Sequence, residues 1–159
     1  MADTMTLMIL LVAGLAGVVA VSGWLSWIDF HTHRLPNRIV GPLALGVAVW
    51  ILILGVAEGS LDRALLALAW GCAGCGVFFV LHLTAGLGMG DVKYAWPVTA
   101  TLGWFGWSAI RIGLLTLLLT GAAVGIVVMA RGRGRDHRVA YGPFMALGLV
   151  AGIAYGLAV

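Results

Sequence analysis

Two of the six acidic residues in the chain, Asp29 and Asp91, lie at the ends of hydrophobic segments and not in polar loops. A carboxylate in such a place is costly unless it is paired or functional. Two carboxylates held close together cannot both ionise easily, so the pair retains one proton. Such a pair can activate a water with one oxygen and protonate a leaving amine with the other. If the fold brings them together, the two residues predict the chemistry of an aspartic peptidase.

The other four acidic residues have simpler interpretations. Asp3, Glu58 and Asp62 fall in the N-terminal residues or in predicted loops, and Asp136 stands among four arginines. Taken singly, Asp29 and Asp91 also have a simple alternative, as a helix cap or as a charge that reaches the membrane surface. The elements that carry the two aspartates decide between these interpretations.

The composition is that of a membrane protein. The chain has 159 residues, of which 62% are hydrophobic and 9% charged, and its mean hydropathy is +1.10. A soluble domain averages about 45–50% apolar and about 25% charged residues. These values exclude an ordinary soluble enzyme, a disordered tail, a coiled coil and a disulfide-stapled domain. The nine basic residues are too few and too scattered for a nucleic-acid partner, and we expect one membrane-embedded domain over residues 1–159.

The hydrophobic segments predict an all-α integral membrane protein with six transmembrane helices. A bilayer core about 30 Å thick takes roughly 20 apolar residues per helix. Pro97 interrupts the fourth segment, and a short turn near Gly106 to Ser108 separates it from the fifth. The first segment lacks the basic start of a signal peptide, so we expect it to be retained. The predicted spans are 5–28, 39–57, 62–84, 92–109, 110–130 and 141–158.

The basic residues predict the orientation of these spans. Seven of them follow the first, third and fifth spans, and only Arg63 and Arg111 lie on the other side. Because basic loops stay in the cytoplasm, the N- and C-termini are expected on the outer side. The same rule places Asp29 and Asp91 on the cytoplasmic face at similar depth. Interface anchors are expected at four tryptophans, Trp24, Trp27, Trp104 and Trp107.

Three ordered motifs carry a family resemblance. Asp29 is followed by Pro36-Asn37, Asp91 lies in Gly88-Met89-Gly90-Asp91-Val92-Lys93, and Tyr141-Gly142-Pro143-Phe144 opens the last span. In this order the motifs resemble those of the type IV prepilin peptidases, which are membrane aspartic peptidases of the GxGD class. The resemblance spans nearly the whole chain. Presenilin-like GxGD proteases fit less well, since their Tyr-Asp and Pro-Ala-Leu motifs do not occur here.

The resemblance implies an activity, a substrate and a place. Asp29 and Asp91 would be the catalytic pair of a leader peptidase, acting without metal or cofactor at the cytoplasmic face of the inner membrane. Its substrates would be prepilin-like or pseudopilin-like proteins, with a basic leader before a hydrophobic helix. Longer members of the family carry a cysteine-paired cytoplasmic region and also methylate the product. This sequence has no such region, so we expect peptidase activity alone.

The other motif residues are expected to bind substrate or to shape loops. Glycine allows a tight or closely approached backbone, so Gly88 and Gly90 would let a peptide approach Asp91. The pair Pro36 and Asn37 would fix the turn into the second span, with Asn37 bonding its own backbone or capping the helix. Lys93 would contact substrate or lipid headgroups, or simply extend to the membrane surface. Pro143 is likewise expected to bind substrate or to shape its loop.

Histidines and cysteines do not predict a metal or redox site. His31 and His33 have no cysteine or carboxylate cluster at ligand spacing. His82 is expected either in the core or in a hydrogen bond near the candidate site. Cys72 and Cys75, which lie among glycines, favour close helix packing. The basic loop 131–138 is interpreted as an anchor at anionic headgroups.

Two other function classes and one question of assembly stay open. A small proton-coupled transporter would need polar or acidic residues at mid-bilayer, and no charged residue falls there in the predicted spans. A non-catalytic assembly factor of a pilus or secretion system would tolerate neutral replacement of both aspartates. Small-residue stripes would either pack the last two spans together or form a homodimer with a second copy. These stripes are Gly121 and Gly125, and Gly148, Gly152 and Gly156.

Overall fold

The computed structural model describes residues 3–32, 35–130 and 140–159. Over these ranges every regular element is a helix, and there are six. They are α1 (Thr4–Thr32), α2 (Asn37–Glu58), α3 (Leu61–Ala85), α4 (Met89–Trp104), α5 (Trp107–Ala130) and α6 (Gly142–Ala158). The prediction of six helices is confirmed, although several bounds differ by a few residues.

The boundary between α4 and α5 shows the largest difference. The fourth helix was expected to reach residue 109, but α4 ends at Trp104. Gly106 adopts a positive φ of 93°, a conformation that suits glycine and stops a right-handed helix. The amides of Phe105 and Gly106 donate to the carbonyls of Leu102 and Gly103, which closes the final turn.

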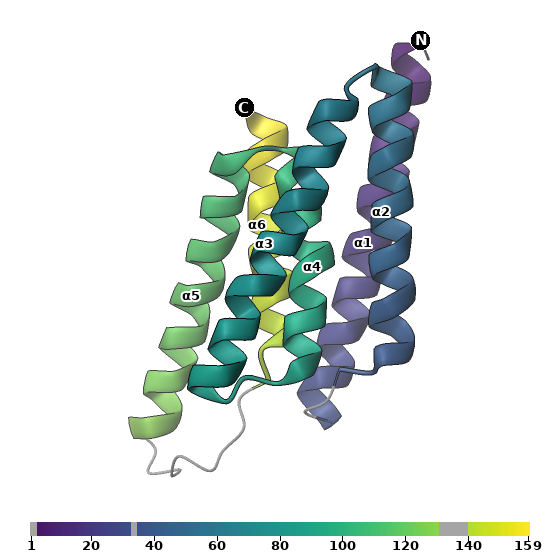
Figure 1. Ribbon diagram of the computed structural model, residues 1–159. Coiled ribbons are helices and arrows are strands. Elements are labelled where there is room, and N and C mark those ends of the chain that lie inside the picture. Colours follow the sequence, from purple (N-terminus) through teal and green to yellow (C-terminus); the bar gives the residue numbers. More distant parts are fainter. Residues whose placement is uncertain (1–2, 33–34, 131–139) are drawn as a thin grey trace.

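The six helices run side by side, and both termini lie at the same end of the bundle (Figure 1). That end, which also holds the α2–α3 and α4–α5 turns, is called the terminal end below. The end of α1 and the start of α4 lie at the other end, together with the end of α5 and the start of α6. We call this second end the aspartate end, because Asp29 and Asp91 lie there. Which end faces the cytoplasm stays a prediction from the basic residues.

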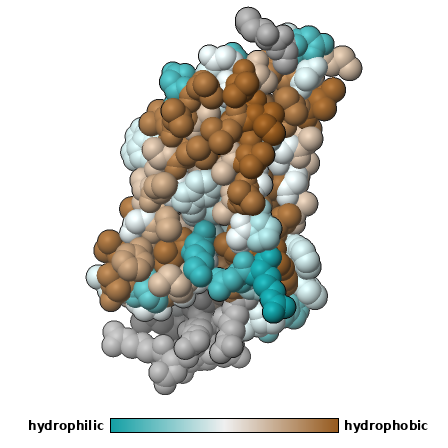
Figure 2. Space-filling view, turned by 45° about the vertical axis from the view of Figure 1, so that its right-hand side comes forward, coloured by the Kyte–Doolittle hydropathy of each residue, from teal (hydrophilic) through white to brown (hydrophobic). Residues whose placement is uncertain are grey.

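Four helices are long and apolar enough to cross a bilayer: α1, α2, α3 and most of α5. The helix α6 is shorter but also apolar. Many large apolar side chains on these helices are exposed, and Figure 2 shows hydrophobic surface over most of the height, with hydrophilic surface toward the two ends. Such a surface matches the hydrocarbon core of a bilayer. The chain is therefore a multi-pass membrane protein.

The least hydrophobic helix, α4, is enclosed by the others. It contacts α2, α3, α5 and α6, and 12 of its 16 residues are buried. The hydroxyls of Thr99 and Thr101 donate to the carbonyls of Ala95 and Pro97, one turn earlier, at 2.7 and 2.8 Å. Protein and not lipid surrounds these polar groups, so α4 holds polar residues that a lipid-facing helix would not.

Glycines allow two pairs of helices to approach closely. On α3, a Cβ at Gly74 would lie 2.2 Å from the Thr99 hydroxyl of α4, so the packing expected beside the cysteines is present. On α6, a Cβ at Gly148 would lie 2.5 Å from the carbonyl oxygen of Gly113 on α5. The α6 stripe thus packs within the chain, whereas a Cβ at Gly125 on α5 would meet nothing within 4 Å.

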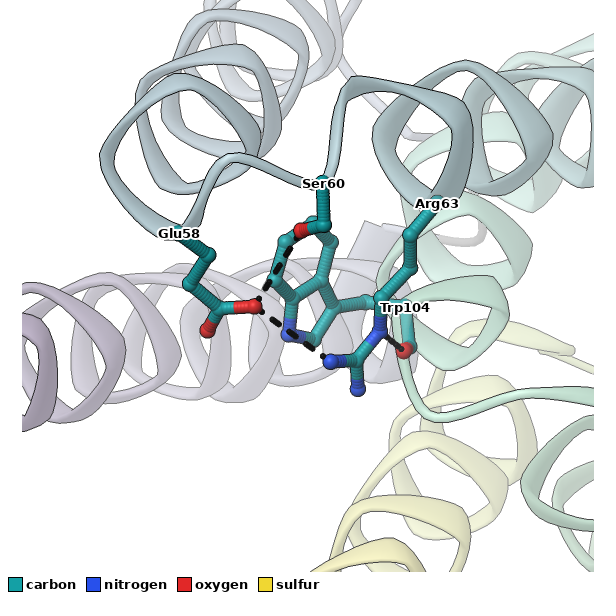
Figure 3. A network of polar contacts seen from close by, with 4 residues as sticks. All are labelled: Glu58, Ser60, Arg63 and Trp104. Carbon is teal, nitrogen blue, oxygen red and sulfur yellow. Dashed lines mark hydrogen bonds and ion pairs between the residues drawn. The ribbon is translucent and has the colours of Figure 1, made fainter. Parts of the chain in front are cut away.

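A polar network joins α2, α3 and α4 at the terminal end (Figure 3). Arg63 donates from Nε to the Trp104 carbonyl at 2.8 Å, and its guanidinium lies 4.5 Å from the centre of the Trp104 ring. Glu58 accepts from Arg63 at 3.4 Å and from Ser60 at 3.3 Å. Trp104 is only 2% exposed, so its expected role as an interface anchor is wrong. It is a core residue because α3 covers it with Arg63.

Candidate active site

Asp29 lies in the last turn of α1 and points into the bundle. It is only 4% exposed, and its Oδ2 accepts a hydrogen bond of 2.8 Å from the backbone N–H of Gly142. Gly142 is the first residue of α6, where free amides and the helix dipole favour a negative charge. The first and last helices thus meet at this carboxylate.

Gly142 is not one of the predicted site residues, although its neighbour Pro143 in the same motif is. A Cβ at position 142 would lie 2.8 Å from Asp29 Oδ2 and 3.1 Å from its Cβ, so only glycine fits here without movement. Pro143 lies in the first turn of α6, where its fixed φ suits a helix start. Ser26 on α1 adds a bond of 3.2 Å to the Gly142 carbonyl.

Asp91 lies in the first turn of α4 and is 8% exposed. Gly88 precedes this helix as its N-cap residue, and its carbonyl accepts from the Asp91 amide at 3.1 Å. A Cβ at Gly88 would lie 2.9 Å from Asp91 Oδ2. A larger residue at position 88 would therefore displace the Asp91 carboxyl.

The two carboxylates act on each other. Asp91 lies outside the four long apolar helices, at the aspartate end. Burial, and next the negative charge of Asp29, raise the pKa of Asp91 to about 7, against a small opposing effect of its backbone hydrogen bond. Such repulsion requires the two groups to be near each other in a poorly solvated place. The fold therefore brings together the two aspartates that the sequence singled out.

The loop before Asp91 is held in shape by α3. Gly86 ends α3 with a positive φ of 70°, and its amide donates to the His82 carbonyl. The His82 ring also hydrogen-bonds through Nδ1 to the carbonyl of Leu87. Of the two roles considered for His82, the structure favours the one near the candidate site, since the ring fixes the glycine loop.

The connection from α1 to α2 packs against the start of α4. A Cβ at Gly90 would lie 2.9 Å from the Cβ of Leu35, so glycine permits this contact. Lys93 donates from Nζ to Asn37 Oδ1 at 3.1 Å. Pro36 is the N-cap residue of α2, as expected of the turn. Asn37 was expected to cap the helix or to bond to its own backbone. Its amide oxygen instead accepts the hydrogen bond from Lys93 of α4.

Several residues considered earlier do not join the site. Among the described residues, no three histidine, cysteine or acidic side chains cluster as metal ligands would. The His31 ring bonds through Nδ1 to the Trp27 carbonyl on its own helix. His33 and the basic loop 131–138 lie outside the described residues.

The chemical capacity of the arrangement follows from the carboxyl pair. The raised pKa of Asp91, about 7, lets this carboxyl hold a proton near neutral pH, while one oxygen of Asp29 accepts the Gly142 N–H. One group can therefore give a proton while the other takes one, which is what hydrolysis of an amide requires.

The profile of the type IV leader peptidase family matches residues 16–129. The chain belongs to this family. The matched range includes both aspartates and the glycine loop, and it ends before the start of α6.

Curated relatives named prepilin leader peptidase/N-methyltransferase match along most of the chain. The protein of Burkholderia pseudomallei (strain 1026b) is 33% identical over 152 residues, which cover 88% of this chain and 45% of that protein. The Escherichia coli (strain K12) protein is 32% identical over 140 residues, or 82% of this chain and 58% of that protein. The Legionella pneumophila protein is 32% identical over 141 residues, or 80% and 45%.

The chain therefore spans about half the length of the curated relatives it matches. No solved structure matches it.

Proposed function

We propose that this member of the type IV leader peptidase family is a membrane aspartic endopeptidase. It removes the N-terminal leader of prepilin-like proteins at the cytoplasmic face of the inner membrane. The observation that carries the proposal is the pair of buried, interacting carboxyls, Asp29 and Asp91, at one end of a membrane-spanning bundle. The relatives' printed names support a prepilin leader as the substrate.

The two carboxyls have different parts in the reaction. Asp29, with one oxygen held by the Gly142 amide, is the base that takes a proton from the attacking water. The water oxygen bonds to the scissile carbonyl carbon, and the proton of Asp91 passes to the amide nitrogen as the C–N bond breaks. The second hydrogen of the water stays on the new carboxyl group of the leader, the other product is a new N-terminal amine, and the pair retains one proton.

The glycine loop and the α1–α2 connection have supporting roles. Gly88 and Gly90 present a backbone without side chains beside Asp91, so an extended substrate segment can approach the carboxyl closely. Pro36, Asn37 and Lys93 hold the connection against α4. No metal or cofactor takes part in this mechanism.

Leader cleavage of a co-expressed prepilin tests the proposal. Asp29→Asn and Asp91→Asn keep the size of the side chain but cannot exchange a proton, so each should lower cleavage by about 100-fold or more. Asp62→Asn, at an exposed position in the first turn of α3, is the matched control and should cleave normally.

The variants must reach the membrane at wild-type levels for the comparison to count. Normal processing by either aspartate variant would reject the aspartic mechanism. It would favour a non-catalytic role in pilus or secretion assembly.

A further inference from the structure

An apolar groove runs between α1 and α2, the two helices side by side at the right of Figure 1. Its volume is about 490 Å³. Most of the residues that line it are glycine, alanine, valine, leucine or isoleucine, with Trp24 and Arg38 toward the aspartate end and Trp50 toward the terminal end.

The groove has the length of a short helical segment and is closed at one end. Its α1 wall extends from Ala13 to Trp24, about three turns or roughly 16 Å. Near the terminal end, the Trp50 indole donates to the Leu10 carbonyl at 2.9 Å and lies over Gly14. Trp50 therefore bounds the groove toward the terminal end, whereas among the described residues no such side chain is placed across its other end.

The two helices that form the walls of the groove lead toward the candidate active site. Asp29 follows Trp24 on α1 by five residues, about 7 Å along the helix. On the other wall, Arg38 directly follows Asn37, which bonds to Lys93 of α4. A chain leaving the open end thus reaches the level of the two carboxyls within a few residues.

The surroundings restrict what can occupy the groove. The walls offer few polar partners, and in a bilayer a peptide must satisfy its backbone hydrogen bonds internally. An apolar α-helix meets this requirement, and an extended peptide does not. The position of the groove beside the carboxyls favours a helix that belongs to the substrate.

We propose that this groove receives the apolar helix that follows the scissile bond of the substrate. The helix lies along α1 and α2, and the segment before it turns toward Asp29 and Asp91. This inference rests on the proposed function, because it names the part of the substrate that the site uses for binding.

Two glycines that line the groove are suitable sites for substitutions that test its occupancy. A Cβ at Gly17 or at Gly46 would meet no atom within 4 Å, so a larger side chain there fills the groove without meeting the protein at its first carbon. Gly23 on α1 and Gly41 on α2 are equally open but lie outside the groove lining. They are matched controls on the same two helices.

The first experiment compares kcat/KM for the four glycine-to-leucine variants on a purified prepilin in proteoliposomes. Gly17→Leu and Gly46→Leu should lower kcat/KM by about tenfold or more, mainly through KM, because a blocked groove excludes the helix. Gly23→Leu and Gly41→Leu should stay within about twofold of wild type. Unchanged cleavage by both groove variants would overturn the inference and would indicate that lipid chains occupy the groove.

The second experiment does not depend on cleavage. A photoreactive benzoylphenylalanine at position 17, in the Asp91→Asn background, should crosslink to the apolar helix of the prepilin, and the same probe at position 23 should not. Crosslinks to lipid alone, or equal crosslinking from both positions, would overturn the inference. If crosslinking is specific while wild type cleaves no prepilin, only the proposed function fails.

Discussion

At the scale of single residues, the two carboxyls of the candidate site have different neighbours. Asp29 accepts an amide proton from the start of another helix, whereas burial and a like charge act on Asp91. The two carboxyls therefore have different surroundings, although they have the same side chain. The proposed acid and base parts follow this difference.

The pKa of Asp91, about 7 in the folded protein, predicts how cleavage depends on pH. Below this value Asp91 holds the proton that the leaving amine needs, so kcat should fall as the pH rises above about 7. The pH profile of kcat on a purified prepilin measures this limb. A rate that stays constant to pH 9 would contradict the assignment of Asp91 as the acid.

The same raised pKa has a consequence for stability. Because the folded protein binds the Asp91 proton more tightly than the unfolded chain does, stability is highest below about pH 4 for this group and is lost as the pH rises through about 7. Asp91→Asn should therefore raise the midpoint of thermal unfolding at pH 8 more than at pH 4.

Gly142 supports Asp29 through its backbone and through its lack of a side chain. Gly142→Ala would place a Cβ 2.8 Å from the Asp29 oxygen, so the carboxylate must move. We expect cleavage to fall by about tenfold or more, since a displacement of about 1 Å is costly in a catalytic site. Gly125→Ala, which adds its Cβ to open space, is the control and should cleave normally.

The sequence predicted the two carboxyls of the candidate site, Asp29 and Asp91, because a carboxylate at the end of an apolar segment is conspicuous. It missed Gly142, which contributes a main-chain amide 113 residues away from Asp29. Every residue except proline has such an amide, so residue type gave no direct signal. The glycine before Pro143 was the available clue.

At the scale of elements, a hydrogen bond between side chains joins the start of α2 to α4. Lys93 donates to Asn37, and both side chains are exposed, so their loss should not unfold the protein. Asn37→Leu and Lys93→Met should each lower cleavage severalfold by loosening the connection. Asn37→Asp keeps the acceptor oxygen and should retain activity.

Cleavage assays of these three variants measure the effect. If Asn37→Asp is as defective as Asn37→Leu, the contact with Lys93 is not the reason that this position matters.

The burial of Trp104 at the end of α4 could not be predicted from the sequence. Trp104 was expected at a membrane interface because tryptophans concentrate there. The structure buries it because Arg63, 41 residues earlier, covers the ring and bonds to its carbonyl. Only the assembled bundle contains this contact, so local hydropathy could not predict it.

Arg63 also supports a prediction about stability. Arg63→Met keeps the apolar stem but removes the hydrogen bond and the cation–π contact, a loss of about 1–2 kcal/mol. The midpoint of thermal unfolding in detergent should fall by a few degrees. Leader cleavage should not change, because the network lies at the terminal end. Arg111→Met, which removes an exposed contact with Ser108, is the control.

At the scale of the whole molecule, hydropathy predicted the six helices because each lipid-facing surface must be apolar. It was least informative for α4, which protein encloses on several sides and which can therefore contain Pro97, Thr99 and Thr101. The groove between α1 and α2 was not predictable, because it depends on how the faces of two helices meet.

The length of α4 has a consequence for the second reactant of hydrolysis. At about 1.5 Å per residue, its 16 residues measure about 24 Å, while the hydrocarbon core of a bilayer is about 30 Å thick. Its neighbours α1 and α3 are longer, with 29 and 25 residues. A helix that protein encloses need not match the thickness of the hydrocarbon core. Because Asp91 lies in its first turn, water for hydrolysis would reach this carboxyl from the aspartate end and would not need a channel through the bundle.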